Sequence, residues 1–185
     1  MNWIGNRISF VDGKGKTTIV ILPEKNFFVS ALMGAWLTMW LTIGFTVIWS
    51  LFSFLLTQQE EIIIYIFLVF WLYYALKVSR SFLWLLYGKE LIKMDNIAFY
   101  YKKSLLNYGK TIPYYYENLR GLTYQIPDAG SFQAIWEKSP WISGSERFHF
   151  EYFTKVIHFG RKLSEKESKL LFQLLNKRIQ ERSKK

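Results

Sequence analysis

Few residues in this chain have the type and spacing that chemistry requires. The run GKGKT, residues 13–17, resembles a phosphate-binding loop, in which backbone N–H groups and a lysine surround the phosphates. That loop needs the longer spacing G-x-x-x-x-G-K-[ST] between a strand and a helix. Here the glycines lie between two runs of β-branched residues, so we expect the tip of a β-hairpin and no nucleotide site.

Other candidates for catalysis are equally sparse. The chain has no Cys, which excludes disulfides, thiol catalysis and thiolate metal ligands. Its two histidines, His149 and His158, lie in strand-like runs, and alternation would place Arg147, His149 and Glu151 on one face and the phenylalanines on the other. We find no paired carboxylates, no nucleophile with a base and no metal-ligand spacing. We therefore expect no enzymatic activity, no metal and no cofactor.

The run IAFYYKK, residues 97–103, combines aromatic rings with positive charge. Single-stranded nucleic acid binds to such faces, but an anionic membrane surface or a protein partner suits them as well. We expect a half-buried strand that contacts lipid headgroups, with a protein partner as the alternative. We expect no nucleic acid, because the usual basic-patch and fold signatures are incomplete. The expected membrane-surface or anion contacts are Lys77, Arg80, Lys89, Lys93, Lys102, Lys103 and Lys110.

Two apolar segments predict a membrane hairpin. Residues 27–56 contain no Asp, Glu, Lys or Arg, and about 20 such residues span a hydrocarbon core. A second apolar run begins at Ile62 and continues past Lys77 and Arg80, whose long side chains reach toward the headgroups. We expect spans at residues 27–56 and 62–82, within a transmembrane unit of residues 26–87.

Basic residues are distributed unevenly about these spans. Four lie in residues 1–25, none lies in the turn that carries Glu60 and Glu61, and twenty lie from Lys77 onward. The positive-inside rule then makes both termini cytoplasmic and places the turn outside. We expect a two-pass protein of the inner (cytoplasmic) membrane.

Small and hydroxyl-bearing residues recur at every fourth position of the first span and predict a helix-packing ridge. Such residues let membrane helices approach closely. The ridge either packs against the second span or forms a seam to another subunit or a pore lining. The hydroxyls do not decide between these, because Ser and Thr also bond to their own backbone. The ridge residues are Ser30, Gly34, Thr38, Thr42, Thr46 and Ser50.

Outside the spans, the pattern predicts strands closed by one helix. Residues 1–25 are expected to form a β-hairpin, and residues 88–185 contain strand-like runs separated by turn residues, as in an antiparallel sandwich or barrel. Those runs are ELIKM, IAFYYKK, residues 114–116, LRGLTYQI, SFQAIW, RFHFEYF and KVIHFG.

The period then changes to that of an amphipathic helix at residues 164–182. Ser164 and Glu167 predict a capping box at its start. Basic residues near its end, on the exposed face, suit the negative pole of the helix dipole; they are Lys177, Arg178 and Arg182. The expected apolar face consists of Leu170, Leu171, Leu174, Leu175 and Ile179.

The loop IWEKSPWISGSE, residues 135–146, carries two tryptophans, Trp136 and Trp141, on either side of Ser139-Pro140. Exposed aromatic anchors are favoured contact residues in protein interfaces. Either these rings contact a protein partner, or they close over the sheet edge or enter the bilayer interface.

Antiparallel strands closed by one C-terminal helix resemble the pleckstrin-homology-like (PH-like) fold. The two spans followed by WLLYGKELIKM, YYYENLRGLTY and VIHFGRKLSEKESKLLFQLL resemble bacterial two-transmembrane-helix proteins that carry such a domain. The expected fold class is therefore a membrane α-helical hairpin plus an α+β cytoplasmic domain, a PH-like sandwich or barrel. The resemblance implies a binding or assembly module and no particular ligand. It also requires the hairpin of residues 1–25 to join the sheet.

We expect a non-enzymatic scaffold or assembly subunit of an inner-membrane complex, whose partners are the lipid bilayer and either a membrane protein or further copies of the chain. The alternative is an effector similar to two-span proteins of antiphage defence. Its β-domain would bind a small anionic signal, such as a cyclic nucleotide, and its spans would oligomerise through the ridge and breach the membrane. A small anionic ligand is expected only under this alternative.

The absence of cysteine allows a direct test of the topology. A single Cys at Gln58 should react with an impermeant thiol reagent added from outside, because the turn is expected to be external. A Cys at Ser183 should react only after the membrane is permeabilised. Mass-shift labelling measures both, and the reverse pattern would overturn the orientation.

Overall fold

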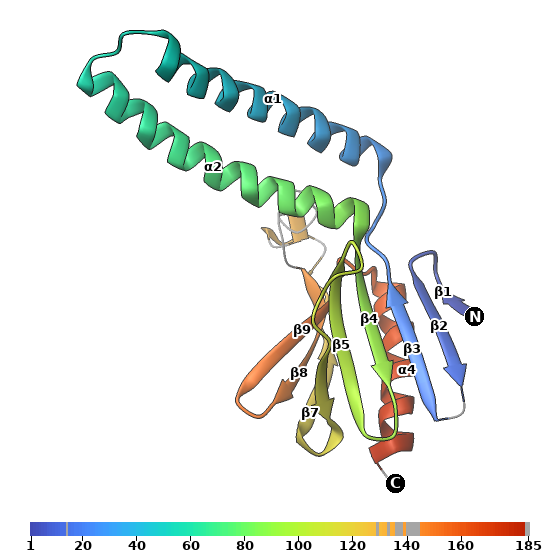
Figure 1. The fold of residues 1–185 in the computed structure, drawn as a ribbon. Helices are drawn as coiled ribbons and strands as arrows, with labels where there is room; N and C mark the ends of the chain where they lie inside the picture. Colours follow the sequence, from blue (N-terminus) through green and yellow to red (C-terminus); the bar gives the residue numbers. More distant parts are fainter. Residues whose placement is uncertain (14, 129, 133, 136–138, 140–144, 184–185) are drawn as a thin grey trace. The chain divides into compact units, whose positions relative to one another are not determined.

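The structure, a computed structural model, describes the chain except residues 14, 129, 133, 136–138, 140–144 and 184–185. The chain divides into two units (Figure 1). One is a pair of helices, Lys25–Leu86, which we call the helical unit. The other combines Met1–Glu24 with Tyr87–Lys185, and we call it the β unit. The β unit is therefore assembled from chain on both sides of the helices.

The helical unit contains two long helices. They are α1 (Phe27–Ser53) and α2 (Gln58–Tyr87). Both are long and apolar enough to cross a membrane, and both are mostly exposed. α2 begins before the apolar run because the Glu60 carboxylate accepts from the Thr57 N–H at 2.8 Å, as in a capping box. The expected spans were 27–56 and 62–82. α1 ends earlier, at Ser53, whereas α2 begins earlier, at Gln58, and ends later, at Tyr87.

A pair of tryptophans joins α1 to α2. The indole N–H of Trp40 donates to the Trp71 carbonyl at 3.2 Å, and that of Trp71 donates to the Trp40 carbonyl at 2.7 Å. Gly44 makes room for the second ring, since a Cβ there would lie 1.9 Å from Trp71 Cε2. Both indole N–H groups are thus satisfied within the helix pair, as an apolar environment requires.

The β unit contains two antiparallel sheets. The larger has the order β1 (Asn2–Ile4), β2 (Ile8–Gly13), β3 (Lys16–Ile21), β4 (Gly88–Met94), β5 (Ala98–Leu105) and β6 (Ile112–Tyr115). The smaller has the order β7 (Leu119–Tyr124), β8 (Glu146–Tyr152) and β9 (Lys155–Arg161). These strands confirm each expected run except SFQAIW, and β1 was not expected.

The N-terminal hairpin belongs to the larger sheet. β3 pairs with β4 from Thr17↔Met94 to Ile21↔Glu90, so the strands on either side of the helices are neighbours. β3 ends at Ile21, and β4 starts at Gly88, the residue after α2. Both connections to the helices therefore leave the same end of the sheet, which we call the helix-joined end. The opposite end, with the β2–β3 and β4–β5 turns, is the distal end.

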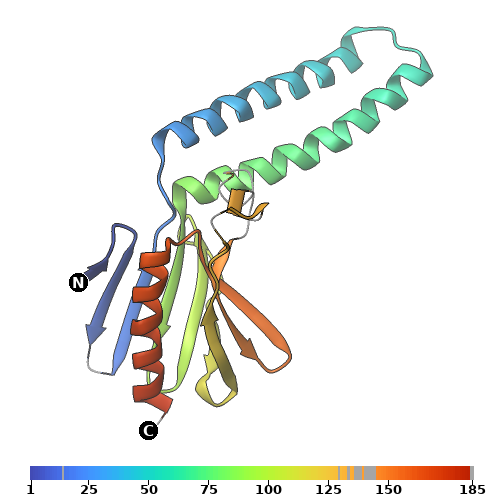
Figure 2. The ribbon, with the colours of Figure 1, turned by 180° about the vertical axis from the view of Figure 1, so that it is seen from behind.

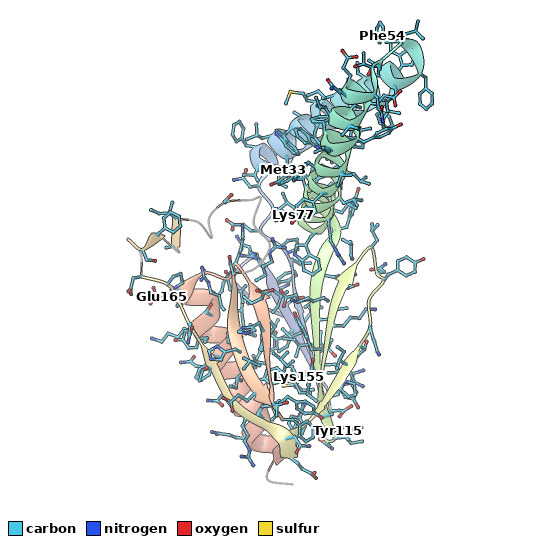
Figure 3. All side chains as sticks on the ribbon, turned by 90° about the vertical axis from the view of Figure 1, so that its left-hand side faces the viewer. Met33, Phe54, Lys77, Tyr115, Lys155 and Glu165 are labelled. Carbon is cyan, nitrogen blue, oxygen red and sulfur yellow. The ribbon has the colours of Figure 1, made fainter. Side chains whose placement is uncertain are left out.

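The core of the β unit lies between the two sheets and α4 (Glu165–Ser183), which runs along the larger sheet in Figure 2. Phe99 and Phe150 come from different sheets and are fully buried, with ring centroids 5.5 Å apart. Leu171 and Leu175 of α4 are also fully buried. Figure 3 shows side chains filling the space between the sheets.

α4 starts at the predicted capping box. The Ser164 N–H donates to the Glu167 carboxylate at 3.0 Å, and the Glu167 N–H donates to Ser164 Oγ at 3.3 Å. The expected apolar face is wrong at Leu170, which is 41% exposed. The buried face is centred on Leu171 instead, and the fully buried Ser168 lies on it.

The expected strand SFQAIW is wrong in its described residues. The Ser131 hydroxyl accepts from the Ala134 N–H at 3.1 Å, and the Ser131 carbonyl accepts from the Ile135 N–H at 3.2 Å. These bonds make a helical turn. A serine that caps its own chain competes with strand pairing, which explains why the apolar residues did not predict the conformation.

A buried carboxylate links the two sheets at the helix-joined end. Glu90 of β4 is only 2% exposed. It accepts from the Tyr101 hydroxyl of β5 at 2.8 Å and from the Gly160 and Arg161 N–H groups of β9 at 2.8 and 3.0 Å. Burial, followed by the nearby Glu90 charge, raises the pKa of Tyr101, so its hydroxyl remains a donor.

Tyr101→Phe should weaken this link. Loss of a hydrogen bond to a charged acceptor costs about 1.5–3 kcal/mol, so amide exchange in the peptide that covers β9 should accelerate. Hydrogen–deuterium exchange of the full-length protein in detergent measures this. Tyr100→Phe is the matched control, because Tyr100 lies on the other face of β5 and should leave β9 protected. Equal exchange in the two variants would contradict the role of the bond.

Candidate functional site

The lysines expected to contact a surface are concentrated at the helix-joined end of the larger sheet. Lys89 is the second residue of β4, and β5 carries Lys102 and Lys103 opposite Leu91 and Glu90. Lys110 lies in the connection between β5 and β6. Four of the five candidate lysines of the β unit thus share one end. Lys77 and Arg80 belong to α2 in the helical unit.

Lys93, the fifth, lies nearer the distal end and has local partners. Its ammonium is 3.3 Å from the Asp95 carboxylate and 4.7 Å from the centroid of the Tyr100 ring. Phe99 and Tyr101, on the other face of β5, are buried in the core. The tyrosine-rich strand is therefore half buried, and its outer aromatic ring stacks with a neighbouring lysine.

Lys103 is paired across to the smaller sheet. Its ammonium lies 3.0 Å from the carboxylate of Glu146, at the start of β8. Burial raises the pKa of Glu146, but the hydrogen bond and the charge of Lys103 lower it by more. The pKa of Glu146 is therefore below its ordinary value. This pair leaves less positive charge available at the helix-joined end than the sequence suggests.

The other lysines surround a tight turn between β5 and β6. The Lys89 ammonium donates to the Asn107 side chain at 2.5 Å, and the Lys102 ammonium donates to the Asn107 carbonyl at 3.2 Å. The turn itself presents apolar groups: Leu106 is 50% exposed and Tyr108 is 84% exposed. We call residues 105–108, with Lys89, Lys102 and Lys110, the turn surface.

A polar cleft lies at the distal end. Its volume is about 190 Å³, and it is lined by Asp12, Gly13, Gly15, Thr17, Asn96, Arg178, Glu181 and Arg182. The Arg178 guanidinium bonds to the Asp12 and Glu181 carboxylates, each at 2.7 Å. Arg182 donates to the Thr17 hydroxyl at 2.8 Å. The expectation that these arginines form an exposed basic face is wrong, because they join α4 to the β2–β3 hairpin.

The charges in this cleft balance one another. Two arginines face two carboxylates, so the cleft has no net preference for an anion. Gly13 pairs with Lys16 across β2 and β3, so the described residues of the GKGKT run lie at the hairpin tip. The structure therefore agrees with the expectation of a hairpin tip.

The two histidines are neighbours on β8 and β9. His149 pairs with His158, with ring centroids 5.9 Å apart, and a ring nitrogen of His149 lies 2.8 Å from the Thr123 hydroxyl. Phe148 and Phe150 are buried on the opposite face, which confirms the predicted alternation. No group of three metal-ligating side chains occurs among the described residues. The histidines therefore act as paired strand residues.

The ridge residues of α1 have different environments. A Cβ at Gly34 would lie 3.4 Å from the Phe82 ring of α2, so this glycine faces the second helix. Thr38, Thr42 and Thr46 are exposed, and each hydroxyl donates to the carbonyl four residues earlier at 2.9 Å. α2 leaves these threonines uncovered. The remaining hydroxyls also bond to their own helix, and they belong to Ser30 and Ser50.

Two expected contacts, Trp136 and Trp141, lie outside the described residues. Comparisons with protein-family models, with curated proteins and with solved structures found no match.

Sequence reasoning missed three structural features of the β unit. Glu90 had a visible signal, since it shares the inward face of β4 with Ile92 and Met94. Arg7 had none: its guanidinium donates to the Lys162 carbonyl at 2.7 Å, far along the chain. Leu106 itself also had none, and the only signal for its turn was the neighbouring Asn107, a residue type that turns favour.

Asp12 should contribute pH-dependent stability. Burial raises its pKa, but hydrogen bonds from Thr17 and Arg178 lower it more, so the net pKa is below its ordinary value. The contribution is then present above about pH 4 and lost as the pH falls through the folded-state pKa.

Asp12→Asn should therefore lower the free energy of unfolding by less than about 1 kcal/mol at pH 7, because the pair is partly exposed. The difference from the unmodified protein should shrink below about pH 4. Urea unfolding in detergent over this pH range measures it, with the exposed Glu117→Gln as control. A difference that persists at low pH would show that the carboxylate charge is not the cause.

Proposed function

We propose that this is a two-pass inner-membrane protein that holds a non-enzymatic, PH-like binding module at the cytoplasmic leaflet. In this role it serves as a scaffold or assembly subunit of a larger membrane complex. One observation carries the proposal: both apolar helices connect to neighbouring strands at the end of the sheet that also collects Lys89, Lys102, Lys103 and Lys110.

The length of the helices supports a membrane anchor. At 1.5 Å per residue, the 30 residues of α2 extend about 45 Å, which matches a bilayer with its headgroup layers. The apolar side chains of both helices are mostly exposed, whereas a core helix of a soluble protein would bury them.

The arrangement of charge supports a binding module. The charged groups singled out in the β unit link structural elements: Glu90 joins the two sheets, Arg178 joins α4 to a hairpin, and Lys103 joins β5 to β8. Charged groups do meet in the distal cleft, but there Arg178 bonds to both Asp12 and Glu181, which supports a structural role for these described residues rather than a catalytic one. Two antiparallel sheets covered by a C-terminal helix are consistent with a PH-like domain.

The effector remains the second candidate because of Thr38, Thr42 and Thr46. Their exposure on α1 leaves a small-residue surface on which another copy could pack within a membrane. Thr42→Leu should then abolish any toxicity that expression causes in the presence of its signal. Growth curves measure this, and toxicity that survives the substitution would eliminate the ridge as a pore seam.

The scaffold proposal predicts a stoichiometric partner. The tagged protein, extracted from native membranes in mild detergent, should give a particle whose mass requires a second protein. Trp136→Ala or Trp141→Ala should weaken capture by roughly 30-fold or more if these rings are interface anchors. Trp3→Ala is the matched control, because Trp3 is 53% exposed on β1.

Mass photometry with mass spectrometry of the purified particle measures both results. Unchanged capture by the two variants would remove those tryptophans from the interface. A particle that contains only copies of this chain would contradict the scaffold and favour the effector.

A further inference from the structure

The turn between β5 and β6 is a hydrogen-bonded two-residue turn with an apolar tip. The Leu105 N–H donates to the Tyr108 carbonyl and the Tyr108 N–H donates to the Leu105 carbonyl, both at 2.9 Å. Leu106 and Asn107 have φ of 50° and 70°, as a type I′ turn requires. Such a turn favours Asn and Gly, whereas a leucine with positive φ is uncommon and strained.

An exposed leucine in this conformation has no evident benefit in water. It packs little, since half of its surface is exposed, and its backbone would prefer another residue. Tyr108, at 84% exposed, is likewise uncovered. Tyrosine is enriched where a membrane meets water, because its ring is apolar and its hydroxyl is polar. A lipid interface would supply the missing contact for both side chains.

The turn lies close to where the chain leaves the helices. Leu105, its first residue, pairs with Gly88, which directly follows the last residue of α2. Paired residues on neighbouring strands are about 5 Å apart. The length of α2 matches the bilayer with its headgroup layers, as noted above, so its final residue is expected at the outer edge of the headgroups. The turn therefore begins at the depth where it can enter the interface.

The charges around the turn suit an anionic lipid surface. The ammonium groups of Lys89 and Lys102 bond to Asn107, within the turn, and Lys110 is exposed two residues beyond it. A headgroup phosphate near the turn would thus meet several cations within one Debye length. A protein surface would need both complementary charge and access beside the bilayer.

We propose that the β5–β6 turn inserts into the interface of an anionic bilayer, with Leu106 and Tyr108 among the headgroups and Lys89, Lys102 and Lys110 on the lipid phosphates. This contact is a second attachment of the β unit, independent of its covalent connection to the helices. It rests on the proposed membrane location, and it adds that the module is held against lipid in one orientation.

The test uses the full-length protein in nanodiscs that contain phosphatidylcholine with or without phosphatidylserine. Because the chain lacks cysteine, single Cys substitutions can carry an environment-sensitive fluorophore. The positions are Tyr108 in the turn, Asn96 at the distal end, and Phe45 on α1 as a marker of the anchor. Lipid-borne and aqueous quenchers then report whether each label contacts lipid or water.

We expect the label at residue 108 to be quenched severalfold more by the lipid-borne quencher than the label at residue 96, and more strongly with phosphatidylserine present. Lys102→Gln with Lys110→Gln should reduce that dependence on anionic lipid. Leu106→Asn should reduce lipid quenching at residue 108 while keeping the turn, because Asn favours the backbone conformation that Leu106 adopts.

The labels at residues 108 and 45 test the turn contact and the membrane anchor separately. A label at residue 108 that is as open to the aqueous quencher as the label at residue 96 would refute the insertion. If the label at residue 45 is lipid-quenched in the same experiment, the membrane anchor stands and only the turn contact fails. If the label at residue 45 is also open to water, the proposed membrane location fails with it.

Discussion

The pairing of β3 with β4 is the constraint on which the rest of the structure depends. These strands are joined in sequence through two helices, yet they form a continuous antiparallel ladder from Thr17↔Met94 to Ile21↔Glu90. Neighbouring strands are only about 4.8 Å apart, so the chain leaves the sheet toward α1 and returns to it from α2 at nearby points. An even number of crossings is the only way to meet this condition if the helices span a bilayer. The fold of the β unit therefore requires both halves of its chain on the same side.

Polar contacts join both the two halves of the β unit and its two sheets. Arg7 from the N-terminal segment donates to the carbonyls of Arg161 and Lys162, and Glu90 on β4 accepts from β9 within the C-terminal segment. Burial lowers the pKa of the Arg7 guanidinium more than Glu167 and the other nearby carboxylates raise it. Losing one partner of such a contact leaves a buried charge unmatched, which is strongly destabilising. These bonds thus favour one arrangement of the segments over alternatives with similar apolar burial.

The sequence predicted what depends on local pattern and failed where distant partners decide. Alternation correctly placed Phe148 and Phe150 inside, and the Ser164 capping box located the start of α4, because both signals lie within a few residues. No local signal shows that Ile21 pairs with Glu90 or that Arg178 meets Asp12, since these contacts join distant segments. The expectation of an exposed face on α4 failed at Arg178 and Arg182 but not at the exposed Lys177, because a charge with a distant partner looks the same in sequence as a solvated one. Lys89, Lys102 and Lys110 are visible in the sequence as basic residues, but their grouping around one turn is not, because the turn needs a positive φ at Leu106 and only Asn107 is a residue that favours it.

Basic side chains at the two ends of the larger sheet have different kinds of partner, and this difference bears on the proposed function. At the distal end, Arg178 is matched by Asp12 and Glu181 within the unit. At the helix-joined end, Lys103 has Glu146, but Lys89 and Lys102 bond to neutral groups of Asn107. A neutral oxygen compensates an ammonium charge only partly, so these lysines still present a positive electrostatic potential at the surface. An exposed ammonium group without a carboxylate partner remains hydrated in water, so it is not destabilising there. An anionic surface would attract it. This difference in charge supports the proposal that the end of the sheet that the helices leave contacts lipid.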